Sequence, residues 1–216
     1  DSSVAVRLGN INKETQYVLN YLNLEAPELK EEVAEGQKVI MVDHNEFNQS
    51  IKGIEKAKIL GVVDHHRIAN FETSDPLYYT ARPYGCTSTI LFQDFKGKGI
   101  EINREEAILM ASAIISDTLL LKSPTTTKHD EKALEELEKI AGIDIKEYGL
   151  EMLKAGTDLD DFTAKELINL DAKELDKNGI KFVIGQVNTV DIPSVLERQE
   201  ELEKALSTIL RKEIKT

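Results

Sequence analysis

The sequence has a single cysteine, a deficit of basic residues and no long apolar run. Cys86 stands alone among 216 residues, so no disulfide can form within the chain, which fits a reducing compartment. Lys and Arg number 27 against 39 Asp and Glu, and the formal charge of −12 argues against a diffuse basic surface for nucleic acid or anionic membrane. No apolar stretch approaches the roughly 20 residues of a membrane span. We therefore expect a soluble, cytoplasmic protein that binds neither nucleic acid nor membrane.

The chain is long enough for one full domain and the beginning of a second. Domains most often contain roughly 100 to 150 residues. A polar, glycine-containing stretch at 155–163, "AGTDLDDFT", is typical of a linker. We therefore expect a first domain at 1–155, a linker at 156–163, and the first part of a second domain at 164–216.

Strand-like and helix-like segments alternate along the chain. Several apolar runs are continuous in Val, Ile and Leu, a pattern typical of parallel strands buried on both faces. We expect an α/β protein, with a parallel, Rossmann-like sheet flanked by helices in the first domain and part of a smaller α/β domain after it. The expected strands are 4–8, 38–43, 57–64 and 180–187, and the expected helices are 13–24, 85–95, 104–121, 128–142, 146–154, 164–175 and 193–212.

Acidic and imidazole side chains follow two of these runs directly. "VIMVDHNE" supplies Asp43 and His44, and "GVVDHHR" supplies Asp64, His65 and His66. In a parallel α/β sheet, ligands bind beyond the carboxyl ends of the strands, and carboxylate with imidazole suits divalent metals. An aspartate that bridges two ions could activate water against a phosphoryl group. The alternative is that each aspartate forms a turn or caps a helix, and that each histidine lies on the surface.

Asp117 is a further candidate, because it lies in the apolar segment "SAIISDTLLL". An ionised carboxylate is costly to bury without a cation or several hydrogen bonds. The residue therefore either caps a break in the helix or holds a metal, and the pattern alone leaves both open.

Several motifs together resemble the family II inorganic pyrophosphatases of the DHH phosphoesterase superfamily. The Asp-His-His triplet by itself indicates only the superfamily, whereas "DHHRIANF" and "SAIISDTLLLKSPT" narrow the resemblance to the pyrophosphatases. It extends in order over nearly the whole chain, through "VIMVDHNE", "VVDHHRIANFET", "PYGCTSTIL", "SAIISDTLLLKSPTTT", "LKAGTDL", "LDAKEL" and "QVNTVDI".

The resemblance implies a manganese-dependent enzyme that hydrolyses pyrophosphate to two phosphates through a metal-bridging hydroxide. It implies two Mn²⁺ or Co²⁺ ions, joined by Mg²⁺ when substrate is bound, and a homodimer. Asp43 matches the catalytic aspartate that bridges both ions, and His65 and Asp117 match ligands of one ion. His66 matches a catalytic histidine that contacts the substrate phosphate, and Lys173 in "LDAKEL" matches a lysine that contacts pyrophosphate.

The resemblance also predicts roles for the neighbours of these residues. We expect Asp64 to support the site and His44 to take no part in it. Some family members carry nucleotide-binding regulatory modules shortly before the strand that ends at Asp43, and the stretch 29–37 is too short to hold one.

Two elements of the family pattern are absent from the printed sequence. Family members open with a strand and a His-x-x-x-Asp-x-Asp element that supplies further metal ligands, and their second domain ends with a Ser-Arg-Lys element. Without them, we expect the polypeptide to bind metal weakly and to hydrolyse pyrophosphate poorly. The rival functions are another DHH phosphoesterase, acting on polyphosphate, oligonucleotides or cyclic dinucleotides, and a non-catalytic phosphate-binding or metal-binding protein.

Overall fold

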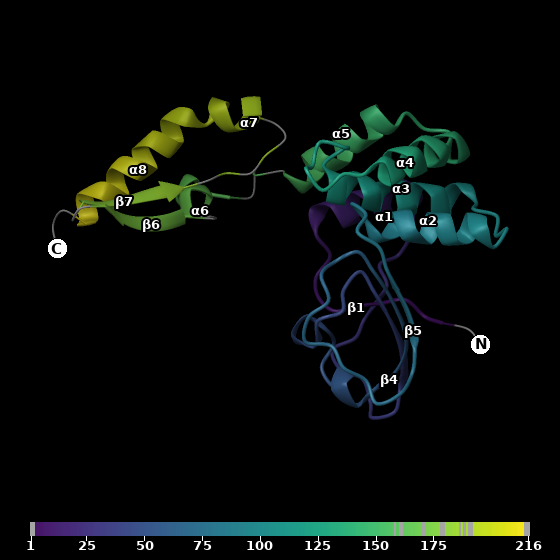
Figure 1. Cartoon of the computed structure of the whole chain (residues 1–216). Helices are drawn as coiled ribbons and strands as arrows, with labels where there is room; N and C mark the ends of the chain where they lie inside the picture. Colours follow the sequence, from purple (N-terminus) through teal and green to yellow (C-terminus); the bar gives the residue numbers. More distant parts are fainter. Residues whose placement is uncertain are drawn as a thin grey trace. The chain divides into compact units, whose positions relative to one another are not determined.

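The computed structural model describes residues 3–157, 159, 162–169, 172–177, 180–185, 187, 189 and 192–213. The chain divides into two compact units, residues 1–152 and residues 153–216. Figure 1 shows the elements of each unit. Within the described residues, no helix is long and apolar enough to cross a membrane.

The first unit contains a three-stranded parallel sheet, as predicted for an α/β protein. Its strands are β3 (Lys38–Val42), β4 (Lys58–Asp64) and β5 (Tyr78–Ala81), with β4 in the centre. Two shorter strands, β1 (Val6–Arg7) and β2 (Glu28–Leu29), pair in parallel with each other. Because β3 and β4 run in parallel as neighbours, their carboxyl ends, and therefore the residues that follow them, meet at one edge of the sheet.

A small apolar core lies against one face of this sheet. Met41, Ile54, Ile59 and Val62 are buried there, and Phe47, Phe71 and Tyr79 pack against them. The short 3₁₀ helices Phe47–Gln49 and Ile54–Lys56 bring their residues to this core.

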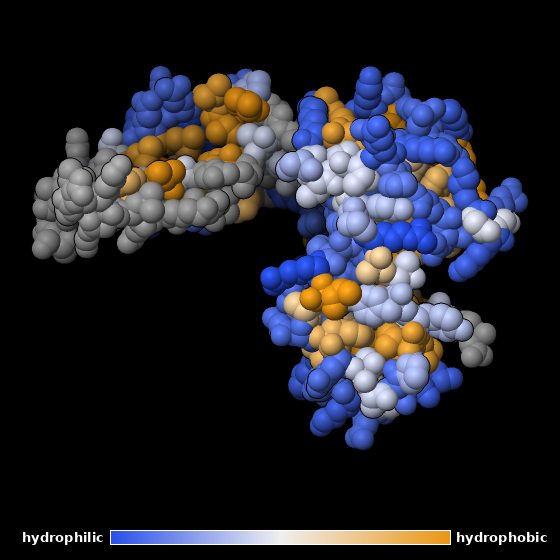
Figure 2. All heavy atoms as spheres, in the orientation of Figure 1, coloured by the Kyte–Doolittle hydropathy of each residue, from blue (hydrophilic) through white to orange (hydrophobic). Residues whose placement is uncertain are grey.

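The prediction that the strands are buried on both faces is wrong for the part of the chain that the structure describes. Ile40, Val42, Leu60 and Tyr78 are exposed, Tyr78 by 88%. Apolar atoms accordingly reach the surface over the strands (Figure 2). A continuous apolar run shows that strand-forming residues are present, but it does not show what covers each face.

In the described part of the first unit, five α-helices begin, and the last of them, α5, continues past Met152 to Gly156. The helix α3 packs against α1, α2 and α4, and α2 contacts β4. Because α3 lies among the other helices, its apolar residues extend around most of its circumference, and Ala107, Ile108 and Ile114 are fully buried. The helices are α1 (Lys13–Leu22), α2 (Thr87–Gly97), α3 (Arg104–Thr118), α4 (Lys128–Ala141) and α5 (Ile145–Gly156).

The helix α3 ends at Thr118, three residues before the predicted end. Leu119, Leu120 and Leu121 follow with φ of 49°, 53° and 64°, in the left-handed region. The Thr118 hydroxyl holds this turn, because it accepts from the Leu121 N–H and donates to the Ile114 carbonyl. The helix therefore stops one residue after Asp117, which places Asp117 in its last turn.

Among its described residues, the second unit contains an antiparallel pair of strands and three helices that begin within it. The predicted helix over 164–175 is wrong in its second half, because Ala172–Lys177 forms strand β6, which pairs with β7 (Ile180–Gly185). The sequence between the two runs contains Asn-Gly, the dipeptide most typical of a two-residue hairpin, and this signal was missed. The helices are α6 (Ala164–Asn169), α7 (Ile192–Glu197) and α8 (Gln199–Glu213).

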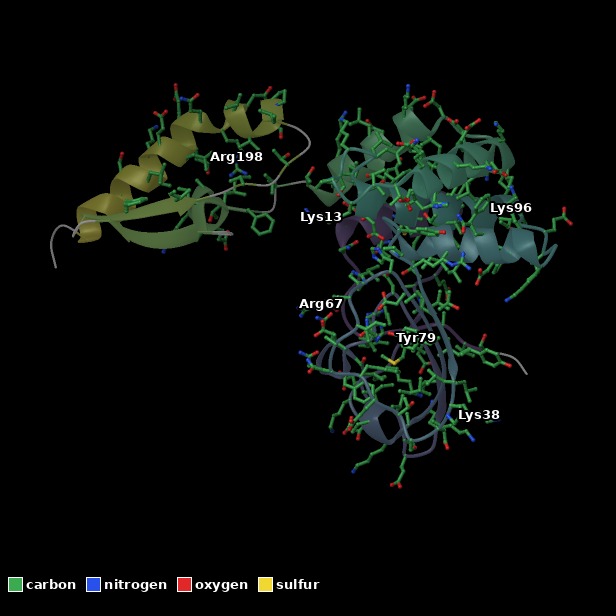
Figure 3. All side chains as sticks on the ribbon, viewed as in Figure 1. Lys13, Lys38, Arg67, Tyr79, Lys96 and Arg198 are labelled. Atoms are coloured by element: carbon green, nitrogen blue, oxygen red, sulfur yellow. The ribbon has the colours of Figure 1, made fainter. Side chains whose placement is uncertain are left out.

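The predicted helix over 193–212 is divided at Arg198, which lies between α7 and α8. The Arg198 guanidinium donates to the carbonyls of Leu159 and Phe162 at 3.0 and 2.8 Å and pairs with Glu201 (Figure 3). The helix α8 also packs against α6. The start of α8 is therefore tied to the chain that precedes α6.

Candidate metal centre

Asp43 is the first residue after β3 and has a strained backbone. Its φ is 65°, in the left-handed region that few residues other than Gly, Asn and Asp adopt. The Asp43 N–H nevertheless donates to the Val63 carbonyl at 2.9 Å, which continues the pairing with β4. Its carboxylate is 52% exposed. Strain of this kind concentrates at functional sites, where the surrounding structure imposes it.

Asp64, at the end of β4, is buried and fully hydrogen-bonded. Its Oδ1 accepts from the N–H groups of His65 and His66 and from His66 Nδ1 at 2.9 Å. Its Oδ2 accepts from Asn45 Nδ2 at 2.6 Å. Burial by itself would raise the pKa of Asp64, but the hydrogen bonds from Asn45 and His66 hold it below the ordinary value. Asp64 therefore fixes the two histidines, and both of its carboxylate oxygens accept hydrogen bonds within the protein.

The two histidines are oriented by different partners. His65 Nδ1 lies 2.9 Å from the Tyr84 carbonyl, and its Nε2 lies 3.6 Å from Asp43 Oδ1. The side chain of His66 is half-exposed, with Nδ1 held by Asp64. One ligand atom each from Asp43, His65 and His66 can be chosen so that all three lie within 4.8 Å of one another. The structure thus brings together three of the predicted site residues.

Asp117 lines a pocket of about 390 Å³ together with Asp43. Burial raises the pKa of Asp117, the hydrogen bond from the Cys86 thiol opposes this, and the nearby charge of Asp43 adds to it. Burial, with Asp117 beside it, also raises the pKa of the Cys86 thiol. Asp117 lies outside the cluster of Asp43, His65 and His66, but it is near enough to interact electrostatically with all three.

Lys173, the fifth predicted residue, lies in β6 of the second unit and pairs with Ile184. The position of its side chain lies outside the described part of the chain, so its predicted contact with substrate is a proposal. His44 is partly buried, its Nδ1 lies 3.0 Å from the Val42 carbonyl, and it is not a member of the cluster of Asp43, His65 and His66.

Asn45 is a functional residue that the sequence interpretation missed. It is 1% exposed, donates to Asp64 Oδ2 and to the Arg67 carbonyl at 2.8 Å, and accepts from the Ala69 N–H. It thereby joins the loop after β3 to the loop after β4. Arg67, labelled in Figure 3, also connects the two loops through an ion pair with Glu46. The available signal was the position of a polar amide two residues after Asp43.

The donor set fits a divalent transition metal. Imidazole nitrogen and carboxylate oxygen together suit Mn²⁺, Co²⁺ or Zn²⁺, whereas Mg²⁺ favours oxygen alone. His65 and His66 each have Nδ1 engaged, so each ring presents Nε2 to a ligand. Asp43, with its exposed carboxylate, has two oxygens available for metal.

The comparisons with known proteins point to one family. Residues 3–114 match the model of the DHH family N-terminal domain, and residues 150–215 match the DHHA2 domain. The chain is 57% identical over 206 residues to the manganese-dependent inorganic pyrophosphatase of Bacillus subtilis (strain 168), covering 95% of this chain and 67% of that protein. The chain belongs to the family II inorganic pyrophosphatases. The resemblance inferred from the motifs is thus confirmed.

Two further relatives extend this result. The chain is 57% identical over 210 residues to a Staphylococcus carnosus (strain TM300) protein named "Probable manganese-dependent inorganic pyrophosphatase", covering 97% of this chain and 68% of the relative. A solved structure from Methanococcus jannaschii, assigned to the family II inorganic pyrophosphatases, matches with a TM-score of 0.73 and 39% identity, over 97% of this chain and 71% of that one. The chain spans about two thirds of the length of its curated relatives.

Proposed function

We propose that this protein hydrolyses inorganic pyrophosphate to two phosphates with the help of Mn²⁺. The observation that supports it best is the convergence of Asp43, His65 and His66 at the carboxyl ends of β3 and β4. The acidic chain does not oppose an anionic substrate, because bound cations would supply the local positive charge. The relatives named as manganese-dependent pyrophosphatases support the choice of metal and substrate.

Each residue has a role that follows from its surroundings. Asp43, exposed and held in a strained backbone, would hold two ions through its two carboxylate oxygens. His65 would contribute one ligand atom from a ring fixed by the Tyr84 carbonyl. Asp117 would contribute one from a carboxylate that is hydrogen-bonded by the Cys86 thiol. Divalent cations at this position would stabilise charge on the phosphoryl oxygens and lower the pKa of water in contact with them.

His66 is placed to contact the substrate. Asp64 accepts from its Nδ1, and about half of its side chain is exposed, so the outer edge of the ring can reach a phosphate oxygen. With Nδ1 held by Asp64, an N–H at Nε2 would donate a hydrogen bond to that oxygen. His66 therefore combines with Asp43 as the catalytic pair in this proposal.

Other parts of the proposal rest on the resemblance to the family. These are the use of Co²⁺ in place of Mn²⁺, the presence of two ions, the joining of Mg²⁺ with substrate, the contact of Lys173 with pyrophosphate, the homodimer and the cytoplasmic location. The domain division at 156–163, with a substrate-clamping second domain after it, belongs with them.

The test is an assay of Mn²⁺-dependent release of phosphate from pyrophosphate by the purified native protein. We expect turnover with Mn²⁺, and its loss in Asp43→Asn, which keeps the size and hydrogen-bonding shape of the side chain. His44→Asn is the matched control, because His44 follows Asp43 directly and lies outside the cluster. Equal activity in Asp43→Asn and the unaltered protein would refute the proposed site.

The same assay distinguishes the other DHH phosphoesterases. Polyphosphate, a short oligonucleotide and a cyclic dinucleotide are offered at the same concentration as pyrophosphate. We expect pyrophosphate to give the highest kcat/KM. A higher value for any of the other three would replace pyrophosphate as the substrate, and metal binding without phosphate release from any of them would favour a non-catalytic protein.

A further inference from the structure

We propose that Asp130, a buried residue of α4, positions His65 for metal binding through the peptide group between Tyr84 and Gly85. This inference rests on the proposed metal site. It concerns a residue 65 positions from His65 in the sequence, with no direct contact between the two side chains among the hydrogen bonds of the described residues.

The connection consists of two hydrogen bonds to one peptide group. On one side, His65 Nδ1 lies 2.9 Å from the Tyr84 carbonyl oxygen. On the other side, the Gly85 N–H donates to Asp130 Oδ2 at 2.9 Å. That carbonyl and that N–H belong to the same planar amide, at opposite edges of it. The peptide group is therefore held between the imidazole of His65 and the carboxylate of Asp130.

Asp130 is suited to hold a charge at this position. It is fully buried, and four donors surround its carboxylate: the Gly85 N–H, the Thr89 hydroxyl, and the N–H and hydroxyl of Thr127. Burial alone would raise its pKa, but the hydrogen bonds from Thr127 and Thr89 keep the pKa of Asp130 below the ordinary value. It also lies in the first turn of α4, where the helix dipole favours an anion. Asp130 therefore remains ionised inside the protein.

An ionised acceptor at the amide N–H changes the other edge of the peptide. The Asp130 carboxylate polarises the amide, and hydrogen bonds that are linked in a chain strengthen one another. The Tyr84 carbonyl therefore becomes a better acceptor. A carbonyl has no proton to give, so His65 Nδ1 must carry the hydrogen. His65 Nε2 then has a free lone pair, directed toward Asp43. Metal-binding histidines commonly donate their other N–H to a carbonyl or carboxylate, and here the carboxylate acts one peptide group away.

The packing around Gly85 shows that Asp130 lies close to the backbone of this residue. A Cβ at position 85 would lie 2.7 Å from Asp130 Oδ2 and 2.9 Å from the Thr118 Cγ2 methyl group, so only glycine fits. Thr118 directly follows Asp117, the other proposed ligand. Gly85 is therefore packed against both Asp130 and the residue that follows Asp117.

Helix capping alone does not account for these contacts. Asp130 and Thr127 form a capping box at the start of α4, and Glu106 and Asn103 form the same motif at the start of α3. Glu106, however, is only partly buried, and the bond of its carboxylate to the Asn103 N–H stays within its own box. Asp130 also reaches Gly85 and Thr89, 45 and 41 residues away. Glu106 is therefore a matched control for the loss of a capping carboxylate.

The test compares Asp130→Asn with Glu106→Gln in the complete protein. The first measurement is the tautomer of His65, read from its ring ¹⁵N shifts in metal-free protein, and the second is Mn²⁺ affinity by calorimetry. We expect His65 to carry its proton on Nδ1 in the unaltered protein and in Glu106→Gln. In Asp130→Asn we expect a population with the proton on Nε2, and a Kd for Mn²⁺ that is about 10- to 100-fold higher.

The inference is overturned if Asp130→Asn keeps both the tautomer and the Mn²⁺ affinity of the unaltered protein to within twofold. Failure of the unaltered protein to bind Mn²⁺ would instead contradict the proposed function, and the tautomer comparison would still decide the inference. If circular dichroism shows that Asp130→Asn does not fold, Gly85→Ala replaces it, because the added methyl group displaces the carboxylate while keeping its charge. In the unaltered protein, rapid hydrogen exchange at the Gly85 amide would also overturn the inference.

Discussion

Asp43 and Asp64 have almost the same sequence context and opposite surroundings. Each follows an apolar run that ends in Val, and their strands are neighbours in the sheet. Asp43 has an exposed carboxylate on a left-handed backbone, whereas Asp64 is buried with four donors around it. The carboxylate oxygens of Asp43 are therefore available for a ligand, whereas those of Asp64 accept hydrogen bonds that hold the neighbouring residues in place.

The largest expected effect is on metal binding at Asp43. Asp43→Asn removes the charge that would hold two ions, so we expect Mn²⁺ affinity to fall by more than about 100-fold, beyond the loss typical of outer-shell residues. The free energy of unfolding without metal should change by less than about 0.5 kcal/mol, as for most exposed positions. Calorimetric titration and urea denaturation measure the two quantities. A large loss of stability with unchanged Mn²⁺ affinity would reverse the roles assigned to the two aspartates.

The next effect is on stability at Asp64. In the unaltered protein, Asn45 Nδ2 and the N–H groups of the two histidines donate to the Asp64 carboxylate. In Asp64→Asn, one carboxylate oxygen becomes an NH₂ group, so some of these donors would face another donor. We expect the free energy of unfolding to fall by about 1–3 kcal/mol, the cost of leaving a buried polar group without a partner. Urea denaturation of metal-free protein measures it. Glu46→Gln, in the same loop as Asn45, is the control, and an equal loss there would indicate general loosening of the loop.

The sequence showed the exposed aspartate and the two histidines beside it better than the hydrogen-bond network around them. Asp43, His65 and His66 could be predicted, because strand ends in a parallel sheet meet at one edge and the residues after them are adjacent in the chain. Asn45 and Asp130 could not, because their importance depends on partners that lie 19 to 45 residues away. A buried hydrogen bond between distant loops leaves no periodic pattern in the sequence.

The fold shows the same limit. The α/β class followed from the apolar runs, but β5 was missed because Tyr78–Ala81 is a four-residue strand without an extended apolar run. The end of α3 at Thr118 was placed too late, because Leu119, Leu120 and Leu121 favour a helix by composition. Tertiary contacts, and the hydroxyl of Thr118, override that local preference.

A pH titration gives a smaller effect that again concerns Asp64. Its pKa is lower in the folded protein than in the unfolded chain, so its contribution to stability is present above about pH 4, the pKa of an unperturbed Asp, and is lost as the pH falls through the folded value. The difference in unfolding free energy between the unaltered protein and Asp64→Asn should therefore be constant near neutral pH and should shrink below about pH 4. Urea denaturation of metal-free protein between pH 3 and 7 measures it, and a constant difference would show that Asp64 is not held ionised.

The smallest effect isolates the backbone strain at Asp43. At a φ of 65°, glycine is favoured over alanine, because a Cβ there meets the neighbouring carbonyl oxygen. We expect Asp43→Gly to be more stable than Asp43→Ala by about 1 kcal/mol. Lys58, an exposed residue of β4, is the control, because glycine in an ordinary strand should be less stable than alanine by about 0.5–1 kcal/mol. Opposite signs at the two positions, measured by urea denaturation, would show that the fold forces the backbone of Asp43 into its conformation. The same sign at both would remove strain from the account of this site and leave the exposure of the carboxylate as its distinguishing feature.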